Sequence, residues 1–408
     1  MYSVVQTSTS FLDNLERRSG ALWDEPSAHS NTSASASIRG APQQILSTEG
    51  GTQQPAHGSM RPLEDNDINI NPLPSPSATE THVQGNTGLE ATNTFLKSAD
   101  TPDFSTAQLQ PGIDFSCPIN ADDISNRWLS SYILVPGKQQ KVYSAPITAF
   151  ICQILKSYAA AAVNGRSVPP FVHFSQTKGA LTNRPLATCL TLVRMSEEPL
   201  RGTENVVADI LRREMSKIYE QHDAFDHVDL LAAFQAYLIY SLVLFFRLNQ
   251  SSSPFLRDAM INLQVLACAS SRKGLICAAE QQHARPPWEA WILAEAKRRT
   301  LYTMYLFDSI LSARDGLPTM LGTELTGLPA PCNRFLWRAL TRPQWETNYN
   351  TYLVDWKEVL CINELWPVPD GMDEAGLSER RRRVDQWLEG VDEYGTMLYA
   401  VTSCTHGN

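Results

Sequence analysis

The sequence predicts an all-α protein in which a multi-helix domain follows a long polar N-terminal tail. Three observations support this fold class. Apolar residues recur every three or four positions through most of the chain after residue 120, which is the period of a helix. No segment shows the period-two alternation of a convincing half-buried strand. Residues 1–110 are instead rich in Ser, Thr, Pro, Gly, Asn and Gln.

Residues 1–110 are expected to form a disordered tail. Stretches such as SAHSNTSASASIRGAPQQ contain too few apolar side chains to offset the conformational entropy that folding removes. The helical domain is expected to occupy residues 120–400. A domain of this length, in a chain that is 43% apolar, can bury a substantial core.

The helices of the domain are expected in a regular series. The first covers residues 125–133, with Ser125 as a candidate N-cap, and the second covers 145–163. Gly165 and the pair Pro169–Pro170 then end the helical pattern and begin an extended connector. Later helices are expected at 185–195, 203–222, 226–249, 254–279, 288–313 and, after a loop rich in Gly and Pro, 333–360.

The apolar stretch Val228–Phe246 is long enough to span a bilayer. Asp229, Gln235 and Ser241 interrupt it, and its flanks lack the aromatic belt and basic loop of a membrane span. A helix that is apolar on most sides is also what the centre of a helical domain requires. We therefore expect a core helix with Asp226 as its N-cap and no contact with a membrane.

Charge and cysteine usage limit the function classes. The formal net charge is −9, whereas a free-standing nucleic-acid binder usually carries a basic surplus. The eight cysteines are scattered, and no two form a Cys-x-x-Cys pair. The N-terminus lacks the basic start and apolar run of a secretory signal. We therefore expect free thiols, no metal site, no cofactor and no direct contact with nucleic acid.

The expected helix at 288–313 carries the most informative polar residues. Glu295 precedes Arg299 by four positions, the favourable order for an intrahelical ion pair. Asp308 lies among apolar neighbours and needs a partner if it is buried. The two acids can be interpreted as a catalytic pair or as structural residues, Glu295 in an ion pair and Asp308 in a helix contact. The structural interpretation is favoured, because such ion pairs are common outside active sites.

Three common enzyme signatures are absent from the sequence. It contains no Gly-x-x-x-x-Gly-Lys phosphate loop, no Gly-x-Ser-x-Gly elbow and no His-Glu-x-x-His. An all-α fold of this size is compatible with a terpene cyclase, but the adjacent pair Asp122 and Asp123 lacks the further carboxylates that a magnesium cage requires. The sequence therefore does not favour an enzyme.

Several segments resemble a known family. Residues 286–308 (PPWEAWILAEAKRRTLYTMYLFD), 327–337 (GLPAPCNRFLW) and 342–356 (RPQWETNYNTYLVDW) are similar to the fungal-specific transcription factor regulatory domain. Residues 168–174 and 184–195 resemble upstream segments of the same family. The resemblance implies an all-helical regulatory domain over about residues 125–360. The residues that carry its motif are Trp288, Trp291, Glu295, Arg298, Arg299, Tyr305, Asp308, Trp337, Trp345 and Trp356.

The sequence departs from this family in one respect. Such regulators typically bind DNA through a zinc binuclear cluster whose six cysteines begin Cys-x2-Cys-x6-Cys. Residues 1–110 contain no cysteine, so the sequence lacks a recognisable cluster. We therefore expect a DNA-bound transcription factor or a second copy of the chain as partner, with a small-molecule effector as a further candidate.

A basic run lies near the C-terminus, at Arg380, Arg381, Arg382 and Arg383. Such a run can serve as a nuclear import signal or contact phosphate. The neighbouring Glu379, and Asp385 and Glu389 further along, favour a solvated helix face instead.

Two function hypotheses follow from the sequence. The first is a nuclear transcriptional regulator, of a metabolic or secondary-metabolite gene cluster as the resemblance implies, that acts through its helical domain. The second is a cytoplasmic scaffold or ligand sensor without a role on chromatin.

Overall fold

The computed structural model describes residues 114–133, 138–177, 184–198, 202–251 and 253–406. Every described residue belongs to the unit Asn93–Asn408. The tail expected at residues 1–110 lies outside the described residues.

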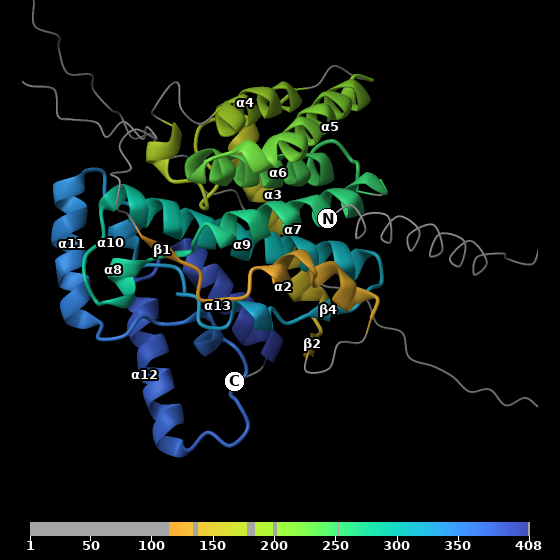
Figure 1. The fold of residues 1–408 in the computed structure, drawn as a ribbon. Helices are drawn as coiled ribbons and strands as arrows, with labels where there is room; N and C mark the ends of the chain where they lie inside the picture. Colours follow the sequence, from red (N-terminus) through yellow and green to blue (C-terminus); the bar gives the residue numbers. More distant parts are fainter. Residues whose placement is uncertain (1–113, 134–137, 178–183, 199–201, 252, 407–408) are drawn as a thin grey trace, which may run out of the picture. The chain divides into compact units, whose positions relative to one another are not determined.

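The described part of the chain is all-α, which confirms the expected fold class (Figure 1). Its α-helices are α2 (Asp122–Ser125), α3 (Ala145–Asn164), α4 (Arg184–Val193), α5 (Glu204–Gln221), α6 (His227–Phe246), α7 (Phe255–Arg272), α8 (Ala278–Gln281), α9 (Trp288–Arg314), α10 (Arg334–Trp337), α11 (Arg342–Asp355), α12 (Glu374–Gly390) and α13 (Glu393–His406). Short 3-10 helices are η2 (Arg127–Ser131), η3 (Phe174–Thr177), η4 (Arg194–Ser196), η5 (His222–Ala224), η6 (Thr323–Leu325) and η7 (Ile362–Leu365).

Two very small antiparallel sheets join segments that are distant in the sequence. Strand β1 (Phe115–Ser116) pairs with β3 (Ile276–Cys277), and β2 (Gln140–Lys141) pairs with β4 (Thr319–Met320). Each strand has two residues, too few for an alternating pattern to be visible in the sequence. These pairs hold the first described segments against the later part of the domain.

The structure corrects four expected elements. The segment 125–133 is not an α-helix, because α2 ends at Ser125 and the 3-10 helix η2 follows it. The segment 254–279 is not one helix, because α7 ends at Arg272 and Gly274 takes a left-handed φ of +90° before β3 begins. The segment 333–360 divides into α10 and α11. Ser125 is not an N-cap: it is the last residue of α2, and its hydroxyl donates to the carbonyl of Asp122.

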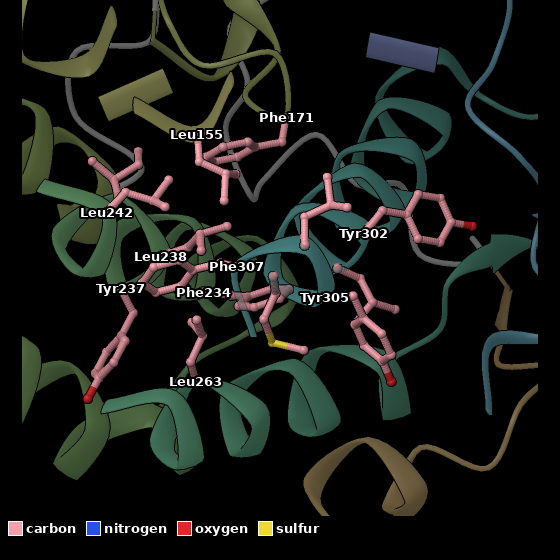
Figure 2. Close-up of a cluster of buried hydrophobic side chains, with 14 of the residues drawn as sticks. Leu155, Phe171, Phe234, Tyr237, Leu238, Leu242, Leu263, Tyr302, Tyr305 and Phe307 are labelled. Atoms are coloured by element: carbon pink, nitrogen blue, oxygen red, sulfur yellow. The ribbon is translucent and has the colours of Figure 1, made fainter. Parts of the chain in front are cut away.

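Helix α6 forms the apolar centre of the domain. The Asp226 carboxylate caps it, as expected, by accepting the backbone N–H groups of Val228 (2.8 Å) and Asp229 (2.9 Å). Helices α3, α4, α5, α7 and α9 all pack against it. Figure 2 shows Leu238 and Leu242 of α6 meeting Leu155 of α3 and neighbouring aromatic rings in this core.

Among the described residues, α3 and α6 are long and apolar enough to pass a length-and-composition test for a membrane span. In α6, 89% of the apolar window is buried inside the protein, against 28% in α3. The apolar character of α6 is thus explained by its place in the core.

Helix α9 is the second buried helix and the longest described one. All 25 residues from Trp288 to Ser312 are buried, including five charged side chains between Glu289 and Arg299 and the Asp308 carboxylate. In Figure 1 it passes between α4–α6 on one side and α12 and α13 on the other. Charges in such a place require partners, and these partners define the candidate site.

Candidate functional site

A cluster of buried charges lies on the N-terminal half of α9. Glu295 is fully buried and accepts hydrogen bonds from Arg299 Nε (2.7 Å) and from Arg298 Nη2 (2.8 Å). Its carboxylate also accepts the backbone N–H of Cys332 at 3.0 Å. The helical spacing of three and four residues brings the two guanidinium groups to one carboxylate. Glu295 therefore forms the ion pair that its spacing from Arg299 predicts.

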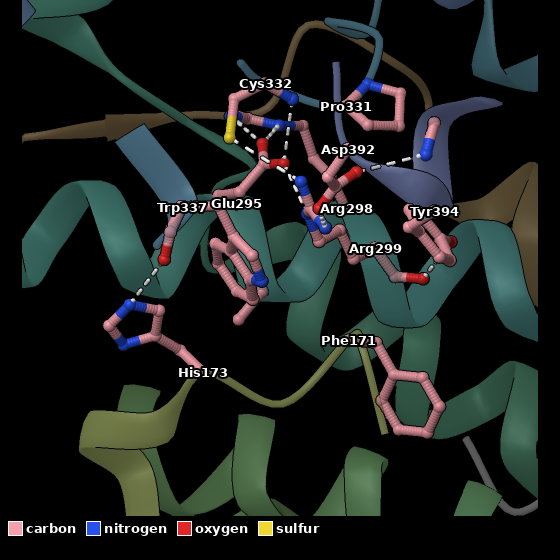
Figure 3. Close-up of polar contacts among 12 residues, drawn as sticks. Phe171, His173, Glu295, Arg298, Arg299, Pro331, Cys332, Trp337, Asp392 and Tyr394 are labelled. Carbon is pink, nitrogen blue, oxygen red and sulfur yellow. Dashed lines mark hydrogen bonds and ion pairs between the residues drawn. The ribbon is translucent and has the colours of Figure 1, made fainter. Parts of the chain in front are cut away.

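Arg299 extends this cluster to the C-terminal part of the chain. Its Nη1 lies 2.6 Å from the carboxylate of Asp392, which stands directly before α13. Asp392 also accepts the backbone N–H of Gly395. One arginine thus connects α9 with the start of α13, as Figure 3 shows.

The electrostatics of the cluster are dominated by burial and pairing. Burial alone would raise the pKa of Glu295, but Arg298 and Arg299 outweigh it and lower that pKa to about 2. Burial would lower the pKa of Arg299, whereas Asp392 and Glu295 hold it well above its ordinary value. The cluster is therefore charged and internally compensated at neutral pH.

Aromatic rings enclose the Arg299 guanidinium. Its carbon atom lies 4.3 Å from the Trp337 ring centroid and 5.2 Å from that of Tyr394. The Tyr394 hydroxyl donates to the carbonyl oxygen of Arg299 at 2.7 Å. His173 Nε2 lies 3.0 Å from the carbonyl oxygen of Trp337 (Figure 3). The connector after α3 therefore contacts the segment that covers Arg299.

A second buried ion network holds the other half of α9. Arg127 of η2 binds Asp308 (3.0 Å) and Glu324 (2.7 Å), and it donates to the carbonyl oxygen of Met320. Glu324 also accepts from the Tyr305 hydroxyl at 2.8 Å. Asp308 therefore has the partner that its burial requires, and it fixes a contact between η2 and α9.

The motif tryptophans lie in three places. Trp291 and Trp345 pack with ring centroids 5.5 Å apart, and Tyr349 joins them from α11. Trp288 presents an edge to His173. Trp356 directly follows α11, and the guanidinium carbon of Arg383 lies 5.8 Å from its ring centroid. Four of these tryptophans belong to one buried cluster that attaches α10 and α11 to the first turns of α9: Trp288, Trp291, Trp337 and Trp345.

Lys297 is a buried cation without a carboxylate partner among the described residues. Its ammonium group donates to the carbonyl oxygen of Gly274 at 2.9 Å and lies 5.5 Å from the Phe115 ring centroid. Burial, followed by repulsion from Lys273, lowers the pKa of Lys297 to about 7. It therefore binds backbone carbonyls and does not take part in the ion networks.

The four arginines of the basic run play two different roles on α12. Arg383 binds both carboxylate oxygens of Glu364, and Arg380 donates to three backbone carbonyls of the η7 region. Arg381 and Arg382 are exposed, and Arg382 pairs with Glu379. Two of the four are thus held in structural contacts and two face solvent. Their role in nuclear import stays a prediction.

Two hollows adjoin the Glu295–Arg299–Asp392 cluster. A small pocket of about 40 Å³ reaches Arg298 and Cys332 between α9, α11 and α12. A wider groove of about 510 Å³ lies between α3, the 168–174 connector and the start of α13, and Trp337 and Asp392 form part of its wall. The cluster thus reaches a hollow on each of two sides.

The sequence pattern indicates Glu295, Arg298, Arg299 and Asp308. It does not indicate their distant partners. Arg127 is 181 residues from Asp308, and Asp392 is 93 residues from Arg299. No local pattern marks Arg127 or Asp392 as buried. Their only signal is indirect, since a buried acid or base on α9 requires an opposite charge from elsewhere.

The two ion networks hold segments of the domain together by pairing buried charges. Each carboxylate of the two networks accepts from a cation, so both networks consist of paired charges. The seven cysteines whose side chains the structure describes are free thiols. Among the described residues, no group of three or more His, Cys, Asp or Glu side chains is placed to hold a metal ion.

Comparison with known proteins gives one match. Residues 180–379 match the family model described as the fungal specific transcription factor domain. The matched range contains every motif residue from Trp288 to Trp356 and ends before Asp392. No curated protein and no solved structure matches the chain.

Proposed function

The chain carries a fungal specific transcription factor domain over residues 180–379, and from this premise we propose that it is a nuclear regulator of transcription. The family is one of transcription regulators and not of enzymes. The observation that carries the proposal is this match over the helices around α9. The target genes we propose are a metabolic set, such as a secondary-metabolite cluster.

We propose that the regulator reaches promoters through a DNA-bound partner or a second copy of the chain. Two properties support this proposal. The net charge of −9 opposes the attraction to phosphate that supplies most non-specific DNA affinity. The cysteines are spaced too widely for a zinc cluster.

The helical domain is proposed to transmit a signal by changing how its parts pack. Arg299 supports this, because one side chain contacts α9, the Trp337 segment and the residue before α13. A packed element with paired buried charges tends to occupy discrete arrangements, since an intermediate position would leave a charge uncompensated. A partner or effector that favours one arrangement would shift the population.

Chromatin immunoprecipitation with sequencing tests the proposal on the tagged chain at native expression. Discrete enrichment at promoters is expected, and a shared motif under the peaks would identify the DNA-bound partner. An empty profile from a well-expressed, folded protein would reject the proposal in favour of a scaffold or sensor outside chromatin. Changing Arg381 and Arg382 to Ala tests import separately, because these two arginines are exposed and the change leaves Arg380 and Arg383 in place.

A further inference from the structure

The groove beside the Arg299–Asp392 ion pair has the size of a ligand site. Its volume of about 510 Å³ lies within the range of small-molecule pockets, about 300–1,000 Å³. Three separate parts of the domain line it: α3, the 168–174 connector, and the segments around Trp337 and Asp392. Such a place between packed elements is where ligand pockets usually occur.

The lining of the groove is mainly apolar. Tyr158 of α3, Phe174 of η3 and Trp337 of α10 contribute aromatic side chains to the lining, and Pro169 and Pro170 contribute apolar rings. Aromatic rings stack well with planar aromatic partners in offset or edge-to-face arrangements. The lining therefore favours a planar aromatic molecule over a flexible polar one.

The charged residues of the lining leave no counterion for a charged ligand. Asp392 is paired with Arg299 in the interior. Glu393 pairs with Arg338 at the exposed rim. A charged ligand would lose its hydration without gaining a partner, and such desolvation is costly. The groove therefore suits a neutral molecule.

One polar group in the lining has unused hydrogen-bonding capacity. The Tyr158 ring packs edge-on against Phe171, and its hydroxyl makes no hydrogen bond to a described residue. Burial, with the nearby Asp392 carboxylate, raises the pKa of Tyr158 above its ordinary value. At neutral pH the hydroxyl is thus a protonated donor, and it would fit an acceptor oxygen on the ligand.

From these observations we propose that the groove binds a neutral, fused-ring aromatic molecule whose carbonyl or hydroxyl oxygen accepts a hydrogen bond from Tyr158. Bound there, the molecule touches Trp337 and Asp392, the ring and the carboxylate that hold Arg299. Ligand binding thus acts on the same contacts by which α9 holds α13. The inference deepens the proposed function, since it gives the regulatory domain an effector site and an effector class.

Equilibrium dialysis of the purified full chain tests the site with two probes, 2-acetylnaphthalene and 2-ethylnaphthalene. They share the fused ring, and only the first has an acceptor oxygen. Saturable binding of both is expected, with 2-acetylnaphthalene the tighter. Tyr158→Phe should weaken 2-acetylnaphthalene by about fivefold to tenfold, as expected for one lost hydrogen bond, and leave 2-ethylnaphthalene unchanged. Equal effects on both probes, or none, would overturn the role of Tyr158.

A blocking variant and its control test the location. Ile154 lines the groove from α3, and Gln153 is the exposed neighbour that does not. Ile154→Trp should fill the groove and abolish binding of both probes, whereas Gln153→Trp should bind them as the unchanged chain does. Thermal unfolding of each variant establishes that it is folded. Undiminished binding in folded Ile154→Trp, or no saturable binding by the unchanged chain, would overturn the proposal.

The dialysis result is independent of chromatin. Binding without promoter enrichment would leave the site intact and reject the proposed function. Promoter enrichment without saturable binding would support the proposed function and reject the ligand site.

Discussion

Helices α6 and α9 are both buried, yet they are stabilised in different ways. The buried residues of α6, from Val228 to Leu244, are apolar apart from Gln235 and Ser241. The buried residues of α9 include carboxylates and guanidinium groups that pair with residues up to 181 positions away. Apolar burial is non-directional, whereas a buried ion pair fixes which two segments meet. The comparison indicates that α6 gives the domain its core and that α9 determines how the other segments attach.

The largest expected effect comes from removing one charge of α9. Arg299→Met keeps much of the side-chain volume but leaves Glu295 short of one cation and Asp392 without one. We expect a loss of about 3–5 kcal/mol in the free energy of unfolding, measured by urea denaturation. The same substitution at Arg382, whose ion pair with Glu379 is exposed, should have almost no effect. Equal stabilities of the two variants would remove the distinction between α9 and an ordinary helix surface.

Lys297 of the same helix, which has no carboxylate partner in the part of the chain that the structure describes, should make stability depend on pH. The folded pKa of Lys297 is about 7, below its ordinary value of 10.5, so between these pH values the unfolded chain binds more protons than the folded one. The free energy of unfolding should therefore rise with pH above 7, by about 1.4 kcal/mol per pH unit from this residue. Urea denaturation at pH 7 and 9 should show this rise, and Lys297→Met should lack about 2 kcal/mol of it. An identical pH dependence in both proteins would contradict the assignment.

Helix α6 should tolerate an apolar substitution that conserves side-chain volume. Leu238 is fully buried between apolar neighbours, as Figure 2 shows. Leu238→Met conserves volume and leaves no charge unpaired, so it should cost less than about 1.5 kcal/mol in the same urea measurement. A loss as large as that of Arg299→Met would mean that α6 is as specific in its contacts as α9.

The smallest expected effect is at the start of α6. Asp226→Ala removes the carboxylate that accepts the N–H groups of Val228 and Asp229. We expect a loss of about 1 kcal/mol, typical of an N-cap, and Asp226→Asn should recover most of it because Asn caps equally well. Failure of Asn to recover stability would assign the effect to charge and not to capping.

The two helices also differ in what the sequence could predict. The length of α6, its buried position and its Asp226 cap all follow from local composition and spacing, and the structure confirms them. The pairing of Glu295 with Arg299 was predictable for the same reason, because four residues along a helix fix the geometry. Local patterns thus revealed both central helices.

The partners that complete the site could not be predicted from local patterns. Asp392 and Arg127 come close to α9 only after the chain has folded, and neither has a distinctive neighbourhood in the sequence. Apolar spacing continues across two helix breaks, so the sequence does not predict them. One divides 333–360 into α10 and α11, and the other ends α7 before Gly274. The groove at Tyr158 is a property of three segments together, so no single segment predicts it.

Native-state hydrogen exchange of Arg299→Met and Leu238→Ala tests whether buried charges on α9 hold the C-terminal helices to an apolar core. Arg299→Met should accelerate amide exchange selectively in α13 and in the segment around Cys332, while α6 and α4 stay protected. Leu238→Ala should accelerate exchange in α6 and its neighbours instead. Identical exchange patterns in the two variants would show that the buried charges of α9 have no such role.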